Sequence, residues 1–409
     1  MNMLSPVSNL TDFMSEPLEF MRNLAQKDHG RPQCLYIGPK RFVFTFDPES
    51  AQEILIKRAD IYVQNRTVFD RIQPVTGKKG LVQLSGQESR EGRMKSRSMF
   101  STSGLESVRA IIENYCEEFL GRVKNQASID VTEEMTSLIL QTALTIFLGI
   151  RSPELAQRIG EKFLRLNYLC GLRMRSLAPA PLYVPTFKNR EIRTLQSEIR
   201  ALIERHLRVD AAVPAAYAGD ENLIDHCMTF LFAGHETTAS SLAFTLLLLA
   251  QNPRYQDSVA RGDESMTLAI YKESLRLFPP AYMLARQAND NDELMGMRVK
   301  KGDQVIVGIA EMHRNSLYFD NPDAFIPERF LEKAKHPFAF IPFGAGAKSC
   351  VGERLAYFEA SIVLKMICEK YVLTCPREDI QSEPLITLHP LSNQKIQIRL
   401  KDGGFSGTP

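Results

Sequence analysis

The sequence predicts a mainly α-helical protein with a smaller β-rich region. Hydrophobic residues recur at helical spacing over several long segments, as in helices that bury one face. Shorter segments are rich in Val, Ile, Phe and Tyr and are bounded by glycine and proline, as strands are. The chain has 409 residues, a length that by itself suggests two or three domains. The segments with helical spacing are Leu105–Leu120, Val131–Leu148, Ser152–Arg175, Phe187–Arg208, Asp220–Ala250, Met266–Leu277 and Glu353–Tyr371.

The first part of the chain predicts a small β-rich unit flanked by short helices. Pro17–Lys27 is expected to be helical, and Cys34–Phe46 alternates as a hairpin does. Pro48–Ala59 predicts a helix with Asp47 as its N-cap and proline at its first position. Because proline and glycine interrupt Tyr62–Leu84, we expect a long irregular connection there.

Two further β segments and a tail follow from the C-terminal half. Tyr282–Ala310 is β-rich, and Ile386–Leu400 alternates as a second hairpin would. Asp402–Pro409 has the composition of a disordered tail.

Composition indicates an ordinary globular protein. Hydrophobic residues make up 44% and charged residues 24% of the chain, and the net charge of +2 gives no field that favours nucleic acid or a membrane surface. The 7 cysteines are odd in number and form no CxxC pair, which indicates free thiols in a reducing compartment. The N-terminal segment lacks a signal-peptide pattern, and no apolar run reaches the roughly 18–20 residues of a membrane span. We expect a cytoplasmic monomer without a membrane anchor or a nucleic-acid partner.

The longest helical segment breaks helix preferences in its middle. Glycine and β-branched residues are poor helix formers, and a local rule broken inside a consistent element often marks a functional site. A tolerated polar patch is the alternative that this stretch alone leaves open. The residues concerned are Ala233, Gly234, His235, Glu236, Thr237 and Thr238.

A glycine-rich loop, Phe343–Gly352, precedes the helical pattern that begins near Glu353 and presents Cys350 at that helix's N-terminus. Free N–H groups and the helix dipole favour a thiolate there. A single cysteine without a Cys or His partner nearby argues against zinc, whereas haem iron accepts one cysteine thiolate as its protein ligand. For an isolated cysteine, the alternative is a buried apolar residue.

These motifs together resemble the cytochrome P-450 family. The family's haem loop, Phe-x-x-Gly-x-(Arg or His)-x-Cys-x-Gly, is matched at Phe343, Gly346, Cys350 and Gly352, with Lys348 in place of Arg or His. The family's (Ala/Gly)-Gly-x-(Asp/Glu)-Thr-(Thr/Ser) motif, its Glu-x-x-Arg pair and its Pro-Glu-Arg-Phe segment precede the loop in family order. The resemblance covers nearly the whole chain and implies a single P-450 domain over residues 1–409.

The resemblance implies haem b as the cofactor, with Cys350 as the axial ligand of the iron. It implies Thr237 and Glu236 as the proton path to bound oxygen. Ser89 stands where the family usually has a His or Trp that meets a haem propionate. Further cofactor-contacting residues implied by the resemblance are Arg93, Arg286, Lys348, Phe343, Gly344, Gly346, Gly352, Ala233 and Gly234. The structural triad that it implies is Glu273, Arg276 and Arg329.

The implied function is a monooxygenase that hydroxylates or epoxidises a hydrophobic small molecule. Its two electrons come from NAD(P)H through a separate ferredoxin or flavodoxin with its reductase. A basic stretch, Gln87–Ser101, either steers such a partner together with Arg354 or is a solvated helix face. A peroxygenase or rearranging enzyme that needs no reductase is one alternative, and the acid–alcohol pair counts against it. A non-catalytic haem sensor or electron carrier is the other.

Apolar residues are expected to line the substrate site, with the Ile386–Leu400 hairpin presenting Thr387, Leu388 and His389. The helix–loop–helix of Ser152–Arg175 and Phe187–Arg208 is a lid in the family, and either Arg71 or the pair Arg173 and Arg175 is expected to meet a carboxylate if the substrate has one. The substrate-lining candidates are Val68, Phe69, Leu81, Val82, Tyr282, Met283, Leu284 and Leu388.

Overall fold

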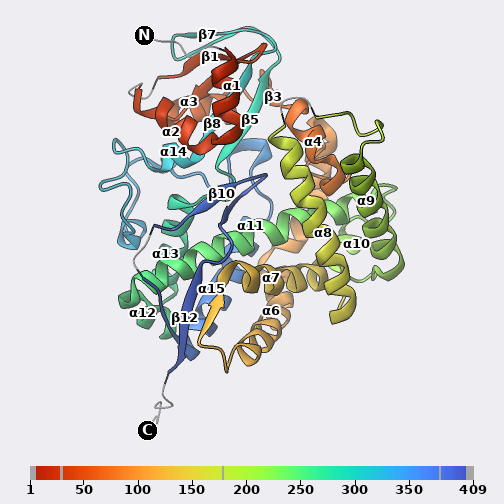
Figure 1. Ribbon diagram of the computed structural model, residues 1–409, viewed down its shortest axis with the longest axis vertical. Coiled ribbons are helices and arrows are strands. Elements are labelled where there is room, and N and C mark those ends of the chain that lie inside the picture. Colours follow the sequence, from red (N-terminus) through yellow and green to blue (C-terminus); the bar gives the residue numbers. More distant parts are fainter. Residues whose placement is uncertain (1–5, 28–30, 177–178, 377–378, 402–409) are drawn as a thin grey trace.

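The computed structural model describes residues 6–27, 31–176, 179–376 and 379–401. A β-rich region with the N-terminal helices lies at the top of Figure 1, and a larger helical region lies below it. This confirms the predicted fold class, a mainly α protein with a smaller β-rich part. The expected tail, Asp402–Pro409, lies outside the described residues.

The helical region is built around α11 (Leu223–Gln251), which crosses the middle of Figure 1. The polar residues of α11 are also mostly buried, since α7 and other helices surround it. A helix that is buried on all sides belongs to the core of a large domain. The other helices of this region are α4 (Arg66–Thr76), α5 (Gly86–Ser96), α6 (Thr102–Arg122), α7 (Val131–Leu148), α8 (Pro153–Met174), α9 (Phe187–His206), α10 (Ala212–Ala216), α12 (Gln256–Ala260), α13 (Glu264–Leu277) and α15 (Glu353–Lys370).

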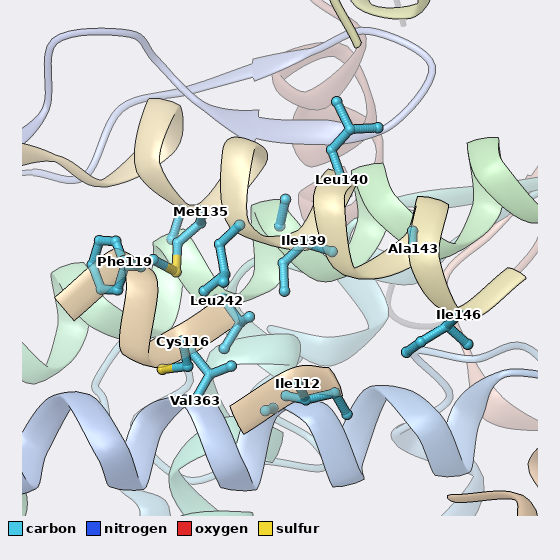
Figure 2. Packing of buried hydrophobic residues seen from close by; sticks show 14 of the residues in the cluster. Ile112, Cys116, Phe119, Met135, Ile139, Leu140, Ala143, Ile146, Leu242 and Val363 are labelled. Carbon is cyan, nitrogen blue, oxygen red and sulfur yellow. The ribbon is translucent and has the colours of Figure 1, made fainter. Parts of the chain in front are cut away.

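The main hydrophobic core forms where α6, α7, α11 and α15 meet. Figure 2 shows Phe119 of α6 and Met135 of α7 close to Leu242 of α11. Val363 of α15 lies below these three residues in this view. All four side chains are buried, and burial of each large apolar side chain contributes roughly 1.5–3 kcal/mol. The core therefore fixes α11 against the helix that follows the cysteine loop.

The β-rich region centres on a five-stranded sheet in the order β1-β2-β8-β5-β3. The pair β2–β8 is parallel and the other pairs are antiparallel. The strands are β1 (Gln33–Ile37), β2 (Lys40–Thr45), β3 (Tyr62–Gln64), β5 (Met283–Ala288) and β8 (Gln304–Gly308). The helices packed around it are α1 (Pro6–Ser15), α2 (Pro17–Lys27), α3 (Pro48–Gln52) and α14 (Ile309–His313).

Smaller sheets complete the fold. One pairs β12 with both β4 and β9, and two are two-stranded. Their strands are β4 (Ser128–Asp130), β6 (Asp292–Leu294), β7 (Met297–Val299), β9 (Tyr371–Thr374), β10 (Ser382–Pro384), β11 (Leu388–Pro390) and β12 (Lys395–Leu400). In the described part of the chain no single helix is long and apolar enough to cross a membrane, although the bent pair α7–α8 passes that test by length and composition.

Two sequence-based expectations about elements were wrong. Tyr62–Leu84 is not irregular, because it contains β3 and α4, and the Asn65 side chain caps α4 by accepting from the Val68 N–H. Ile386–Leu400 is not a hairpin, because β11 pairs with β10 while β12 pairs with β4 and β9. Alternation reveals a strand but not its partner, which is set by packing between distant segments.

Candidate functional site

The cysteine loop is held in shape by its own backbone and by one glycine that admits no side chain. The Cys350 N–H donates to the Phe343 carbonyl over 2.8 Å, which closes the loop. Gly346 has φ +70°, and a Cβ there would lie 2.1 Å from the Leu55 carbonyl oxygen. Only glycine satisfies both conditions. Gly346 therefore allows the loop to pack closely against the Leu55 backbone.

Cys350 lies deep in the protein, yet its side chain is exposed because it faces a cavity. Burial raises the pKa of the thiol, and hydrogen bonds from the backbone N–H groups of Gly352 and Glu353 act in the opposite direction. Glu353 is the first residue of α15, so these donors are the free N–H groups of a helix N-terminus. The arrangement would stabilise a thiolate that gains a cationic partner in the cavity.

The cavity lies between the cysteine loop and one face of α11. Residues three and four apart share a helix face, and this spacing places seven α11 residues along one wall. They are Thr229, Phe230, Ala233, Gly234, Thr237, Thr238 and Ser241. The Thr237 hydroxyl donates to the Ala233 carbonyl over 2.8 Å. Apart from Phe230, small or polar side chains of α11 therefore line the cavity that Cys350 faces.

Three cationic side chains line the same cavity. Arg93 of α5 donates to the Ser349 carbonyl over 2.6 Å, and Arg286 of β5 donates to the neighbouring Ala285 carbonyl over 3.0 Å. Burial lowers the pKa of Arg93 and lowers the pKa of Arg286 to about 10. Across the described ranges none of the three, including Lys348, forms an ion pair with a carboxylate. Buried cations without a counter-charge are costly, so the cavity is suited to an anionic ligand.

Lys348 stands where the family usually has Arg or His, and two hydrogen bonds hold its amine in place. Its Nζ donates to the Leu84 carbonyl and, over 3.1 Å, to the Ser89 hydroxyl. Ser89 is itself the residue that replaces the family's usual His or Trp. Burial lowers the pKa of Lys348 to about 8, with smaller contributions from nearby Arg93 and Arg286.

The residues present fit a haem. A haem carries two propionate carboxylates, and the cavity provides three cations without carboxylate partners. It also provides one thiol, backed by helix N–H groups, on the side opposite the small-residue wall of α11. Nowhere in the described ranges do three His, Cys, Asp or Glu side chains gather as ligands for a bare metal ion.

The predicted triad lies behind the loop and is fully buried at its centre. Arg276 of α13 makes two hydrogen bonds to Glu273, of 2.7 and 2.8 Å, and Arg329 reaches the same carboxylate over 3.2 Å. Arg276 also donates to the His313 carbonyl, and His313 Nε2 accepts from the Ile341 N–H just before the loop. The triad is thus linked to the start of the cysteine loop.

The substrate-lining candidates divide into two groups. Leu81, Val82 and Leu284 line the cavity, whereas the other five candidates are not among its described lining residues. Tyr282 and Leu388 belong instead to a separate apolar cluster, which Met283 packs against. Val68 and Phe69 lie on α4. Sequence reasoning missed the lining residues Phe100, Phe147 and Tyr271, which come from other helices. It also missed Thr229 and Ser241 of the α11 wall. Their i, i+4 spacing from Ala233 and Thr237 would have revealed them.

Glycine at position 234 has a packing role that the sequence did not indicate. A Cβ at Gly234 would lie 2.5 Å from a ring carbon of Phe147. The residue therefore allows α7 to approach α11, besides lining the cavity. Glu236 does not line this cavity at all among the described residues, because it points to another face of α11.

The arginines expected to meet a substrate carboxylate are used within the protein. Arg71 of α4 donates to the Arg173, Met174 and Ser176 carbonyls at the end of α8. Arg173 donates to the Ala180 carbonyl and to Asn189. Their guanidinium groups therefore connect α8 to α9 and to α4.

The fold and the cavity together are suited to binding an anionic cofactor beside a single cysteine. A family model described as Cytochrome P450 matches residues 6–208 and 186–398, so the chain belongs to the cytochrome P450 family.

Named relatives agree along nearly their whole length. The chain is 27% identical to cyclooctatin synthase of Streptomyces melanosporofaciens, over 91% of this chain and 89% of that protein. It is 27% identical to pentalenene oxygenase of Streptomyces avermitilis, over 96% and 95% of the two chains. Among solved structures, CYP175A1 from Thermus thermophillus is 26% identical, with a TM-score of 0.81 and coverage of 95% and 97%.

Proposed function

We propose that the protein is a haem-thiolate monooxygenase that inserts one oxygen atom into a hydrophobic small molecule by hydroxylation or epoxidation. The observation that carries the proposal is the single cavity onto which Cys350, three cations without carboxylate partners and the small-residue wall of α11 all open. For hydroxylation, substrate, O₂, two electrons and two protons give the hydroxylated product and water. NAD(P)H supplies the electrons through a separate ferredoxin or flavodoxin with its reductase.

The cofactor is held by residues around the cavity. Cys350 would bind the haem iron, and Arg93, Arg286 and Lys348 would neutralise the two propionates. Phe343, Gly344, Gly346 and Gly352 would shape the loop that holds the cofactor. When bound, a haem with a cysteine thiolate ligand supplies O₂ binding and O–O cleavage.

On the side of the cavity opposite Cys350, the α11 wall contributes a hydroxyl group and free space. Ala233 leaves room beside the Thr237 hydroxyl, which lines the cavity and carries an exchangeable proton. Leu81, Val82 and Leu284 make the adjoining wall apolar, so it excludes water and favours an apolar substrate. Two compounds that appear in the names of similar proteins are suitable first probes. Pentalenene is named in pentalenene oxygenase, and cyclooctat-9-en-7-ol is named in a 5-monooxygenase of Streptomyces melanosporofaciens.

Electron delivery is expected at the surface beside the cysteine loop. Arg90, Arg97 and Arg354 are exposed there, whereas Lys95 pairs with Asp220 over 2.9 Å. Exposed cations of this kind accelerate association with an acidic partner, and salt screens the effect. Reduction by an acidic ferredoxin should slow as ionic strength rises, and a rate that does not depend on salt would remove this role.

The test is the absorption spectrum of the reduced protein with carbon monoxide, followed by turnover. We expect the strongly red-shifted Soret band of thiolate ligation in the wild type and its loss in Cys350→Ala, while Cys34→Ala is the matched control outside the cavity. Product that needs NAD(P)H and a surrogate ferredoxin system supports a monooxygenase. Product with peroxide alone would indicate the peroxygenase alternative, and a haem protein without turnover on any probe would indicate a sensor or carrier.

A further inference from the structure

Glu236 and Thr237 are neighbours in sequence but line two different hollows. Thr237 lines the cavity shared with Cys350. Glu236 lines a second hollow, the outer groove, between α7, α8, α11 and the β10–β11 hairpin. Figure 1 shows this hairpin beside α11. The groove reaches the surface, since exposed residues such as Glu133 and Gln157 form its rim. Glu236 therefore lies between external water and the wall that carries Thr237.

A four-residue hydrogen-bond network occupies the inner end of the outer groove. Glu236 Oε1 accepts from the Thr387 hydroxyl over 2.7 Å and lies 3.0 Å from His389 Nε2. His389 Nδ1 lies 2.9 Å from the Ser240 hydroxyl. A serine hydroxyl both donates and accepts, so Ser240 satisfies Nδ1 whether the imidazole is neutral or charged. The network can therefore take up and release a proton without breaking.

One end of the network is buried and the other is partly exposed to solvent. The Glu236 side chain is 5% exposed, whereas the His389 side chain is 21% exposed. In the described structure Glu236 Oε2 and His235 Nε2 are buried and have no hydrogen-bond partner, and both residues line the groove. Buried polar atoms without protein partners are normally satisfied by water. Water is thus expected to continue the network inward from His389.

We propose that His389 is a positioning residue that supplies protons from water in the outer groove to Glu236 during turnover. The inference rests on the proposed monooxygenase function. In each transfer the Nε2–H bond of the imidazolium breaks and an O–H bond forms on the Glu236 carboxylate. A proton from the solvent, relayed by water in the groove, then restores the imidazolium, so proton and charge balance and no electron moves. Glu236 passes its proton on toward the Thr237 wall.

Several charged side chains share the outer groove with this pair, namely Glu118, Arg122, Asp130, Glu133, Glu161 and Glu383. Burial alone would raise the pKa of Glu236, but His389, and to a smaller extent His235 and Thr387, lower it, so the carboxylate is charged at neutral pH. The Cys170 thiol of α8 also interacts with Glu236. Glu383 is the cross-strand partner of His389 and approaches Arg175 over 3.7 Å.

The discriminating variant is His389→Gln. Glutamine can still donate a hydrogen bond to Glu236, so it keeps the positioning contact, but it carries no exchangeable charge. We expect the product formed per NAD(P)H to fall at least about threefold, peroxide to rise, and the solvent deuterium isotope effect on product formation to increase. His206→Gln, at an exposed site on α9, is the control and should match the wild type.

A second measurement does not depend on turnover. The thermal unfolding midpoint of the haem-loaded protein is measured for Glu236→Gln, His389→Gln and the double variant. We expect the two single effects to be non-additive, because the residues contact one another.

Additive effects on the midpoint, or wild-type coupling and isotope effect in His389→Gln, would each overturn the proposal. A wild-type protein that shows the thiolate spectrum but forms no product from any probe would instead contradict the proposed function. The midpoint measurement would still report on the His389–Glu236 contact.

Discussion

Lys348 donates a hydrogen bond to Ser89 over 3.1 Å, and each is the residue at which this chain departs from the family pattern. A short hydroxyl at position 89 leaves space for the lysine amine, which the Leu84 carbonyl also orients. The two departures therefore compensate each other. The cavity keeps a cation at this point although it lacks the planar fork of arginine.

The first prediction concerns cofactor retention through this pair. Lys348→Met removes one of three cations facing the cavity, and we expect haem to be lost about tenfold faster, equivalent to about 1.4 kcal/mol. Ser89→Ala removes one hydrogen bond to a charged group and should accelerate loss by a smaller factor. Transfer of haem to an excess of a haem-scavenging protein measures both. Lys333→Met, at an exposed site, is the control, and wild-type retention in Lys348→Met would show that this lysine has no cofactor role.

The second prediction concerns the Thr237 hydroxyl. Thr237→Ala removes the hydroxyl from the cavity wall, so protons arrive more slowly and reduced oxygen escapes. We expect the product formed per NAD(P)H to fall about tenfold, a change of about 1.4 kcal/mol in the competing barriers, with a matching rise in peroxide. Thr245→Ala is a close control, because Thr245 is buried on the same helix and also hydrogen-bonds its own backbone, at the Ser241 carbonyl. Equal coupling in the two variants would contradict a proton role for Thr237.

The third prediction concerns the buried ion pair behind the loop. Glu273 and Arg276 are fully buried, so Glu273→Gln leaves a buried cation without its counter-charge and should cost about 3–5 kcal/mol. Haem content and urea unfolding measure the loss. Glu106→Gln breaks the exposed Glu106–Arg109 pair and should leave stability almost unchanged, because water screens exposed ion pairs.

If Glu273→Gln does not fold, Glu273→Asp tests the same ion pair with Arg276, because aspartate keeps the negative charge on a side chain that is shorter by one methylene group. A stable Glu273→Gln protein with full haem content would show that the triad does not support the loop.

The fourth prediction concerns pH and Glu311 of α14. Burial raises the pKa of Glu311 from 4.5 to about 7, against the attraction of Arg22 and Arg314. A carboxyl whose pKa is higher in the folded state favours folding fully below the unfolded value, and that contribution is lost as pH rises through about 7. Glu311→Gln should therefore become more stable relative to the wild type between pH 4.5 and 8, by about 1–3 kcal/mol.

Thermal unfolding at several pH values provides the comparison, with the exposed Glu293→Gln as control. A constant difference between wild type and Glu311→Gln across this range would mean that Glu311 does not titrate there.

Local signals predicted several elements correctly. The Asp47 side chain caps α3 by accepting from the Ser50 N–H, and the Cys34–Phe46 hairpin forms as an antiparallel pair of β1 and β2. Both depend on residues close together in sequence. The α4 helix was missed because Pro74 suggested a break, yet the Asn65 cap and packing against α8 sustain the helix up to Thr76.

The candidate site divides in the same way. The glycines and cysteine of the loop, and the Ala233–Thr238 run, are contiguous motifs, and their spacing alone indicated the cofactor class. No such spacing indicated the outer groove, because Glu236 and its partner Thr387 are 151 positions apart.

By itself, then, the sequence determined the long helices with regular hydrophobic spacing, the cysteine loop and the family, since each depends on spacing within one segment. Only the tertiary structure decided that Thr237 faces the cofactor cavity while Glu236 faces the outer groove with His389. Adjacent residues on a helix point about 100° apart. Whether each side chain lines the cavity or the outer groove depends on the elements, distant in sequence, that pack against α11.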